Sequence, residues 1–364
     1  MKNTFGQNIT YTLFGESHGE EIGIVIDGLT PGMKVDTDFI AEMLSKRRPS
    51  GMISTTRCEA DEFRIVSGVW NGRTTGTPVC ILIPNTNTQS KDYSKMAALP
   101  RPGHADFTAE CKYHGFQDYR GGGHFSGRLT APLVAAGALL MPALSDKGIH
   151  IGTHIHTLAG VKDRPFSISE LKKDIDILKN SAFPALDEDS AVLMQKKTEE
   201  AAKLGDSVGG ILETVIVGMP AGVGEPWFDS VESLLSHALY SIPAVKGVEF
   251  GDGFALAGMM GSEANDAFTT DGQSVSTKTN RNGGINGGIS NGMPIVIRIA
   301  IKPTPSIYRE QETVNMETME NTRLKIEGRH DPTIVHRAAP VTSAVCAMVI
   351  SDLLSGRYGT DYFS

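Results

Sequence analysis

Three short polar segments of the chain each place a histidine beside glycine or proline. They are residues 15–19 (GESHG), 101–106 (RPGHAD) and 328–332 (GRHDP), and the second and third also contain arginine. Imidazole titrates unaided near neutral pH, and the planar guanidinium of arginine binds phosphate or carboxylate through two parallel hydrogen bonds. Together these segments predict a site that binds an anion and transfers protons.

His18 has two interpretations. As a lone histidine on a loop, it would stabilise a turn through a hydrogen bond to a nearby carbonyl. The flanking glycines leave its ring uncrowded, Glu16 can tune its proton affinity and Ser17 adds a hydroxyl. These neighbours favour general acid–base chemistry.

The segments around His104 and Asp331 also leave alternatives open. His104 follows Arg101 by three residues, so both could act on one phosphate leaving group. Alternatively, Arg101 could pair with Asp106 on a surface turn. Pro332 biases Asp331 away from helical geometry, so its carboxylate could act as a base or could cap the final helix.

Glycine-rich segments offer backbone for binding anions. Residues 121–128 (GGGHFSGR) lack the Gly-Lys-Ser/Thr ending of a Walker A loop but precede a helix, where backbone N–H groups, Ser126 and Arg128 could hold an anion. Residues 280–292 could approach a flat ring or a phosphate, and residues 302–306 (KPTPS) add a cation and hydroxyls stiffened by prolines. A structural turn and a flexible loop are the alternatives for the two glycine-rich segments.

The composition indicates a globular enzyme without a global affinity for polyanions. The 364 residues carry a net charge of -8, which offers no general attraction to nucleic acid or an anionic membrane. No segment approaches the roughly 18 apolar residues of a spanning helix, and no signal peptide is evident, so we expect a soluble cytoplasmic protein. The four cysteines lack the paired spacing of a zinc or redox site, so we expect reduced thiols and no metal: Cys58, Cys80, Cys111 and Cys346.

The pattern of apolar residues predicts strands and helices in mixed order, which favours an α+β fold over a doubly wound parallel sheet. Thr37 is expected to cap a helix that ends at the basic cluster Lys46, Arg47 and Arg48. Further helices are expected at residues 130–144, within the amphipathic segment 167–204, and at 338–354. Strands are expected at residues 9–14, 22–27, 63–67, 78–83, 210–219, 254–260 and 293–301.

The same segments, together with three others, resemble the chorismate synthase family. The motifs that carry this resemblance run nearly from end to end and are GESHG, RPGHAD, KYxGFxDYRGGG, SIxAVKGVE, GGIxGGI and GRHDP. The resemblance implies a single-domain α+β sandwich over residues 1–364, with antiparallel β-sheets around core helices. It also implies a homotetramer as the usual assembly.

The activity implied by the resemblance is the seventh step of the shikimate pathway. Phosphate leaves 5-enolpyruvylshikimate 3-phosphate by 1,4-anti elimination to give chorismate, with no net redox change but a requirement for reduced FMN. A flavin reductase that uses NADPH would need an insertion or a dinucleotide fingerprint, so we expect the monofunctional type, which depends on an external flavin reductase or reductant. The rival interpretation is a non-catalytic protein that senses flavin or phosphate. The presence of His18, His104 and Asp331 argues against it.

The resemblance also implies roles for individual residues. His18 would protonate or stabilise the reduced flavin, His104 would assist the departing phosphate, and Asp331 would help nitrogen 5 of the flavin act as base. The substrate would be bound by Arg47, Arg48, Arg101, Ser126, Gly127, Arg128 and Arg329. The flavin would contact His124, Phe125, Ser126, Pro243, Ala244, Gly287, Lys302, Pro303, Thr304, Pro305, Ser306 and Arg329.

Four positions depart from the family pattern. The family usually has arginine in place of His124, and a second arginine near residues 50–54, where this chain is one residue shorter. Ser343 replaces a usual glutamate and Pro243 a usual asparagine. Because losing one charge-assisted contact costs roughly 1.5–3 kcal/mol, about one to two decades in affinity, we expect a raised Michaelis constant for the substrate.

Overall fold

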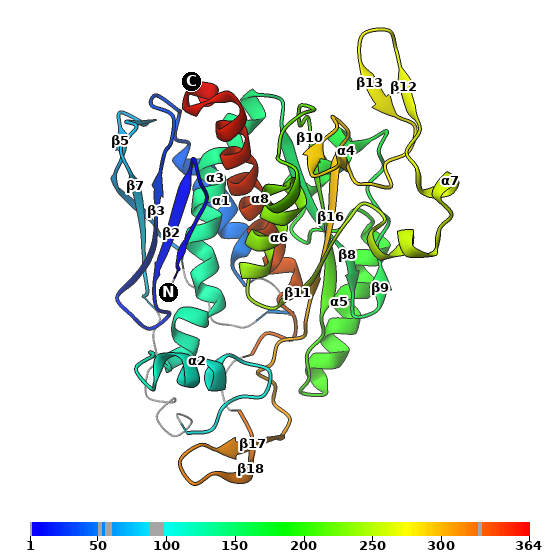
Figure 1. Cartoon of the computed structure of the whole chain (residues 1–364). Coiled ribbons are helices and arrows are strands. Elements are labelled where there is room, and N and C mark those ends of the chain that lie inside the picture. The colour runs from blue at the N-terminus through cyan, green and yellow to red at the C-terminus, as the bar shows by residue number, and fades with distance from the viewer. Residues whose placement is uncertain (1, 50–52, 55–59, 87–97, 327–329) are drawn as a thin grey trace.

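The body of the protein has three layers, two antiparallel sheets with helices between them (Figure 1). The computed structural model describes residues 2–49, 53–54, 60–86, 98–326 and 330–364. The first sheet has the order β1 (Thr4–Phe5), β2 (Thr10–Gly15), β3 (Glu21–Asp27), β7 (Val79–Pro84) and β4 (Arg64–Ser67). The second has the order β11 (Val245–Phe250), β16 (Ile295–Ile301), β10 (Gly210–Val217), β8 (His150–Leu158) and β9 (Val161–Lys162). All strand pairs of the described residues are antiparallel, which confirms the predicted α+β class.

The helices between the sheets are α1 (Thr37–Arg47), α3 (Thr130–Asp146), α6 (Val231–Ser241) and α8 (Val335–Tyr358). In α3 and α8, buried residues lie on nearly every side, because the two helices pack against each other and each contacts a sheet. Residues 127–146 and α8 are long and apolar enough to span a membrane, so the expectation that no segment comes near this was wrong. Their apolar windows are 72% and 89% buried inside the protein, as in the core helices of soluble proteins.

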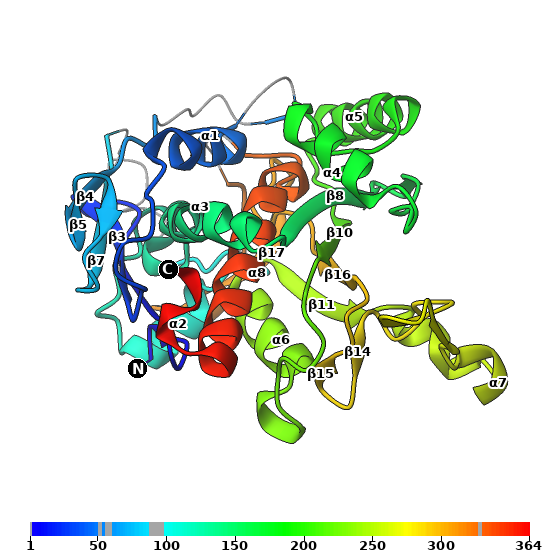
Figure 2. The ribbon, with the colours of Figure 1, turned by 90° about the horizontal axis from the view of Figure 1, so that it is seen from above.

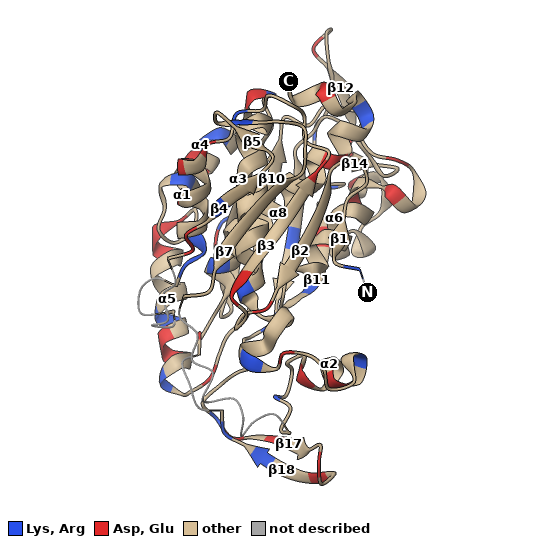
Figure 3. Cartoon of the chain, turned by 90° about the vertical axis from the view of Figure 1, so that its left-hand side faces the viewer, with Lys and Arg blue, Asp and Glu red and all other residues tan. Residues whose placement is uncertain are grey.

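The outer face of the second sheet is covered by α4 (Leu171–Asn180), where Leu171 and Ile175 pack on Val215. Figure 2 shows α4 and α5 (Glu188–Lys203) together at one side of this sheet. Figure 3 shows the charged residues gathered on helices and at strand ends, whereas the middle of β2, β3 and β7 is uncharged.

Short elements complete the chain. The two-stranded units are β5 (Val69–Trp70) with β6 (Arg73–Thr74), β12 (Phe268–Thr270) with β13 (Val275–Thr277), β14 (Ile285–Asn286) with β15 (Ile289–Ser290), and β17 (Gln311–Asn315) with β18 (Glu320–Leu324). Short helices are α2 (Asp106–Tyr113), η2 (Arg120–Phe125), η3 (Gly127–Leu129), η4 (Trp227–Asp229), η5 (Gly253–Gly258), α7 (Gly261–Ala264) and η6 (Thr360–Phe363). The β12–β13 hairpin and α7 project from the body (Figure 1).

Two predictions from the sequence were wrong in detail. The N-cap of α1 is Asp36, whose carboxylate accepts from Phe39 N–H, and not Thr37. The expected strand at residues 254–260 is wrong, because this segment largely forms the short helix η5. The helices expected within segment 167–204 are confirmed as α4 and α5, and on α5 Val192 is exposed whereas Met194 is buried.

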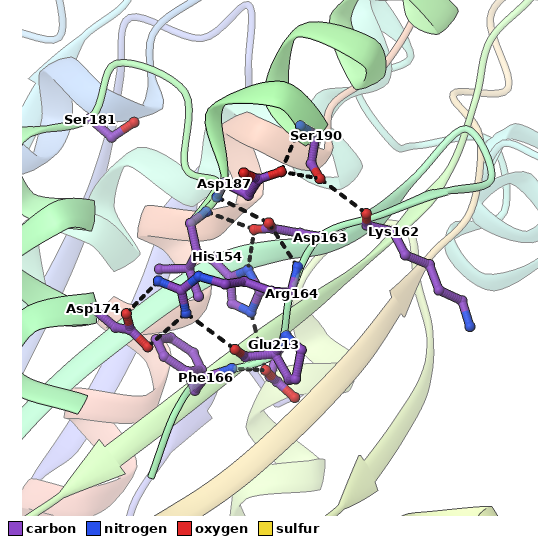
Figure 4. Close-up of polar contacts among 12 residues, drawn as sticks. His154, Lys162, Asp163, Arg164, Phe166, Asp174, Ser181, Asp187, Ser190 and Glu213 are labelled. Atoms are coloured by element: carbon purple, nitrogen blue, oxygen red, sulfur yellow. Dashed lines mark hydrogen bonds and ion pairs between the residues drawn. The ribbon is translucent and has the colours of Figure 1, made fainter. Parts of the chain in front are cut away.

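A buried network of charges joins β8, β10 and the segment after β9 (Figure 4). His154 Nδ1 lies 2.9 Å from Asp163 Oδ2, and its Nε2 lies 3.1 Å from Glu213 Oε2. Because carboxylates accept at both nitrogens, this geometry fits an imidazolium. Ligand atoms of His154, His156 and Glu213 lie within 4.8 Å of one another, but both His154 nitrogens are occupied by carboxylates, so the cluster is better explained as an ion network than as a metal site.

Helix α3 packs tightly against α8 at Gly137, where an added Cβ would lie 2.4 Å from Ala344 Cα. We expect Gly137→Ala to lower the free energy of unfolding by about 1–3 kcal/mol, because overpacking outweighs the better helix propensity of alanine. Denaturant titration checks this. Gly261→Ala is the control, since no atom lies within 4 Å of the new methyl group; equal stability of both variants would contradict the prediction.

Candidate active site

Two of the three histidine segments meet at the glycine run of η2. A Cβ on Gly121 would lie 2.2 Å from His18 Cε1, and one on Gly122 would lie 3.2 Å from His104 Cε1. The φ angles of Gly121 and Gly122 are 59° and 92°, which side chains rarely adopt. The run therefore consists of glycine because two imidazole rings pack directly against its backbone.

His18 lies behind this glycine run, with 7% of its surface exposed. Ser17 fixes the segment, because its N–H donates to Gly123 O (3.1 Å) and its hydroxyl to Arg120 O (3.2 Å). The same hydroxyl lies 3.1 Å from His18 Nδ1. The side chain next to His18 is thus a hydroxyl that can relay a proton.

His104 is held by a carboxylate that arginine also binds. His104 Nδ1 donates to Asp106 Oδ1 (2.7 Å), and Arg101 binds both oxygens of Asp106 through Nε (2.7 Å) and Nη2 (2.8 Å). Burial acts to raise the pKa of Asp106, but hydrogen bonds from Arg101 and His104 outweigh it and hold that pKa well below its usual range. The alternative that Arg101 pairs with Asp106 is therefore confirmed, and the pair also orients His104.

Two arginines of the predicted substrate clamp converge on one buried carboxylate. Asp61 Oδ2 accepts from Arg47 Nη2 (2.5 Å), and Asp61 Oδ1 accepts from Arg128 Nη1. Arg47 Nε is buried and has no hydrogen-bond partner among the described residues. Burial lowers the pKa of Arg47 despite the nearby charge of Asp61. A buried donor left over in this way points to an anionic ligand.

Asp331 lies just before α8 and accepts from Arg337 Nη1 (2.6 Å). The N-cap of α8 is Ile334, without a side-chain hydrogen bond, so Asp331 does not have the capping role considered for it. Arg337 also donates from Nε to Arg47 O (3.0 Å). Arg337 therefore connects the third histidine segment, through Asp331, to Arg47.

The loop that follows β16 closes the site from the side of the second sheet. Lys302 Nζ donates to Gly103 O, and Lys302 N–H donates to Ala244 O (3.0 Å). Thr304 Oγ1 is buried without a partner among the described residues. Residues 243–244, 302–306 and the turn before His104 therefore form one continuous wall.

These segments enclose a cavity of about 1060 Å³. The predicted site residues that line it are Arg47, His104, His124, Phe125, Ser126, Gly127, Arg128, Pro243, Ala244, Lys302, Thr304, Pro305, Ser306 and Asp331. His18, Arg48, Arg101, Gly287 and Pro303 are not among its lining residues. Gly287 forms the tip of the β14–β15 hairpin, and Arg101 lines a smaller adjoining pocket. Arg329 lies outside the described residues.

The charge of the cavity wall is opposite to that of the whole protein. Six lining residues are Lys or Arg, and the only lining carboxylate among the described residues is Asp331. The cations are Lys2, Arg47, Arg128, Lys246, Lys302 and Arg337. Because the chain as a whole carries a net charge of -8, this wall is a local arrangement suited to an anion with several charges.

Asp61 and Arg337 were not predicted from the sequence as residues of the site. Arg337 could have been noticed, because a cation in the first turn of a helix opposes the helix dipole and so suggests a specific partner. Asp61 gives no local signal, since its partners Arg47 and Arg128 are 14 and 67 residues away.

Comparison with known proteins agrees with this site. The family model of chorismate synthase matches residues 9–354. The chain belongs to the chorismate synthase family. A chorismate synthase of Thermococcus gammatolerans is 47% identical over 352 residues, which cover 97% of each chain. A chorismate synthase of Methanocella arvoryzae is 48% identical over 356 residues, covering 97% of this chain and 95% of the relative.

A crystal structure of chorismate synthase has the same fold, with a TM-score of 0.77 and 27% identity over 98% of this chain and 94% of that one.

Two of the residues that were expected to depart from the family pattern lie in different surroundings. His124 lines the cavity, and its Nδ1 donates to Gly15 O (2.8 Å). Ser343 instead lies in a buried chain of hydroxyls, 2.7 Å from Thr153 Oγ1, so its substitution affects the packing of α8 on β8.

Proposed function

We propose that the protein catalyses the 1,4-anti elimination of phosphate from 5-enolpyruvylshikimate 3-phosphate to give chorismate, in a reaction that requires reduced FMN. The observation that carries the proposal is the cavity wall of six cations and one carboxylate. A substrate with one phosphate and two carboxylates matches this charge, and arginine binds both groups bidentately. Membership of the chorismate synthase family supports the same reaction.

The residues present fit a flavin beside the substrate. The cavity of about 1060 Å³ is at the upper end for small-molecule sites, which leaves room for two ligands. The unpartnered Thr304 Oγ1 lies in the wall where flavin contacts are expected. Reduced FMN, when bound, supplies an electron transiently and helps to remove the hydrogen at carbon 6 of the substrate.

The protein's own residues bind, orient and move protons. His104, with Nδ1 committed to Asp106, is left with Nε2 to protonate the departing phosphate. His18 does not line the cavity, so it would exchange protons with the flavin through the hydroxyl of Ser17, which does line it. Asp331, held by Arg337, assists proton removal on the flavin side. We also propose that residues 1–364 act as one catalytic domain, in a cytoplasmic homotetramer supplied by an external flavin reductase.

The test is an anaerobic assay of phosphate release with purified protein, photoreduced FMN and 5-enolpyruvylshikimate 3-phosphate. We expect turnover with reduced FMN and none with oxidised FMN and NADPH. Absence of phosphate release with reduced FMN would exclude the proposed reaction. Turnover with NADPH and oxidised FMN as the only source of electrons would show a bifunctional enzyme instead.

We expect the Michaelis constant for the substrate to be higher than that of a relative with arginine at the position of His124. A missing charge-assisted contact lowers affinity by about one to two decades. The check is to measure both enzymes side by side, together with His124→Arg, which should lower the constant. A wild-type constant equal to that of the relative would rule out this effect of the departure.

A further inference from the structure

Asp61 is a fully buried carboxylate next to the cavity, at a position with no assigned role. Its side chain has 0% exposure, and the side chains of its partners Arg47 and Arg128 have only 6% and 7%. Each oxygen of Asp61 accepts from a different guanidinium, so one carboxylate bridges two cations that both line the cavity.

The contacts of Arg128 show that this bridge completes a rigid arrangement. Besides Asp61, Arg128 donates from Nε to Asn85 Oδ1 (3.0 Å) and from Nη2 to Pro84 O (3.1 Å). Asn85 in turn donates to Gly19 O (2.9 Å), in the segment that carries His18. All three nitrogens of the Arg128 guanidinium thus donate hydrogen bonds to the protein, which fixes the position and the plane of the group.

Arg47 differs, because it keeps a donor that no described residue satisfies. Its Nη2 binds Asp61, whereas its Nε is buried and has no hydrogen-bond partner in the described part of the chain. Two guanidinium groups on the same carboxylate repel each other, and in a buried environment this repulsion is weakly screened. Without the carboxylate between them, the two guanidinium groups would repel each other and move apart.

We propose that Asp61 is a positioning residue that holds Arg47 and Arg128 together as one preorganised anion clamp for the phosphate or a carboxylate of the substrate. This inference rests on the proposed function for the identity of the anion. Preorganisation lowers the cost of binding because the side chains are already ordered before the ligand arrives.

The backbone around Asp61 is built to keep it in place. Its φ of 51° is uncommon for a residue with a side chain, and such conformations persist where the surrounding structure enforces them. Arg48 contributes by donating from Nη2 to Ala60 O, immediately before Asp61. Arg48 therefore supports the clamp from outside the cavity. Glu62 next along the chain is exposed and offers a matched control.

The test compares steady-state kinetics of wild type, Asp61→Asn, Asp61→Glu and Glu62→Gln. We expect the KM for 5-enolpyruvylshikimate 3-phosphate to rise by about ten- to a hundredfold in both Asp61 variants, as for loss of a charge-assisted contact, with kcat little changed. Glu62→Gln, which removes the same charge, should leave both constants unchanged. Asp61→Glu keeps the charge and shifts only the carboxylate, so it carries the test if Asp61→Asn does not fold.

Two results would overturn the inference. An equal or lower KM in Asp61→Asn would mean that Asp61 competes with the substrate for the arginines, since the variant makes the site more positive. A fall in kcat at unchanged KM, in an Asp61 variant whose folded fraction equals that of wild type, excludes a positioning role. If wild type releases no phosphate, the proposed function fails, and calorimetry with inorganic phosphate decides about Asp61 separately: weaker binding in Asp61→Asn than in Glu62→Gln supports the clamp, and equal or tighter binding excludes it.

Discussion

Replacing His104 with alanine should lower the rate of phosphate release by a factor on the order of 10²–10⁴, the usual contribution of a positioned general acid. The ring lines the cavity against Gly122, and its Nδ1 is committed to Asp106. Only Nε2 can then deliver a proton to the leaving group. Single-turnover measurements under anaerobic conditions report the chemical step directly, and we expect the loss in kcat and not in substrate affinity.

Asp106→Asn tests the same arrangement without removing the ring. The ionised Asp106 accepts from Nδ1, whereas an amide can present a donor there and reverse the tautomer of His104. We expect a smaller loss than in His104→Ala, with a changed dependence of kcat on pH. His150→Ala, at an exposed position at the start of β8, serves as the control. A His104→Ala variant as fast as wild type would remove His104 from the mechanism.

The elements that could be predicted from the sequence are those whose own residues form a continuous apolar pattern. Runs of β-branched apolar residues identified β10 and β16, and long apolar stretches identified α3 and α8. It missed β8, because buried polar residues interrupt the apolar pattern. Thr153 and His154 are tolerated inside because polar side chains from elsewhere in the chain bind them, among them Ser343 and Asp163.

In the candidate site, too, local features could be predicted from the sequence and long-range contacts could not. The glycine run and the turn of His104 could be predicted, because their chemistry lies within a few neighbouring residues. The bridge from Asp61 to Arg47 and Arg128 could not, since it depends on contacts between distant segments. For Arg101 the sequence left two alternatives open, a role at the substrate and a pair with Asp106, and the structure shows the pair.

Replacing His154 with alanine should lower the free energy of unfolding by about 3–5 kcal/mol, because it removes the cation that binds two buried carboxylates. His154 and Asp163 are fully buried and Glu213 nearly so, and the imidazole binds both carboxylates. Burial acts to lower the pKa of His154, but the hydrogen bonds that its ring donates to Asp163 and Glu213 outweigh it and raise that pKa. Burial raises the pKa of Glu213, but His154 and Arg298 bring it down to about 2.

Because the two pKa values shift in opposite directions, the stabilisation that the network provides is lost at both high and low pH. Because the pKa of His154 is raised in the folded state, its contribution is complete below the unfolded value of about 6.5 and is lost as the pH rises through the folded value. Because the pKa of Glu213 is lowered, its contribution is present above the unfolded value and is lost as the pH falls toward about 2. The network should therefore stabilise the fold most between about pH 4.5 and 6.5.

Denaturant unfolding of wild type, His154→Gln and His156→Gln across pH 5–9 measures this directly. Wild type and His156→Gln should both lose stability above about pH 6.5, whereas His154→Gln should lack this slope, since it has no imidazole to release a proton. His156 is a suitable control because it lies two residues along the same strand, and burial lowers its pKa, so its ring is neutral across most of the range. A wild-type slope that persists unchanged in His154→Gln would show that another group controls the pH dependence and that the buried imidazole is neutral.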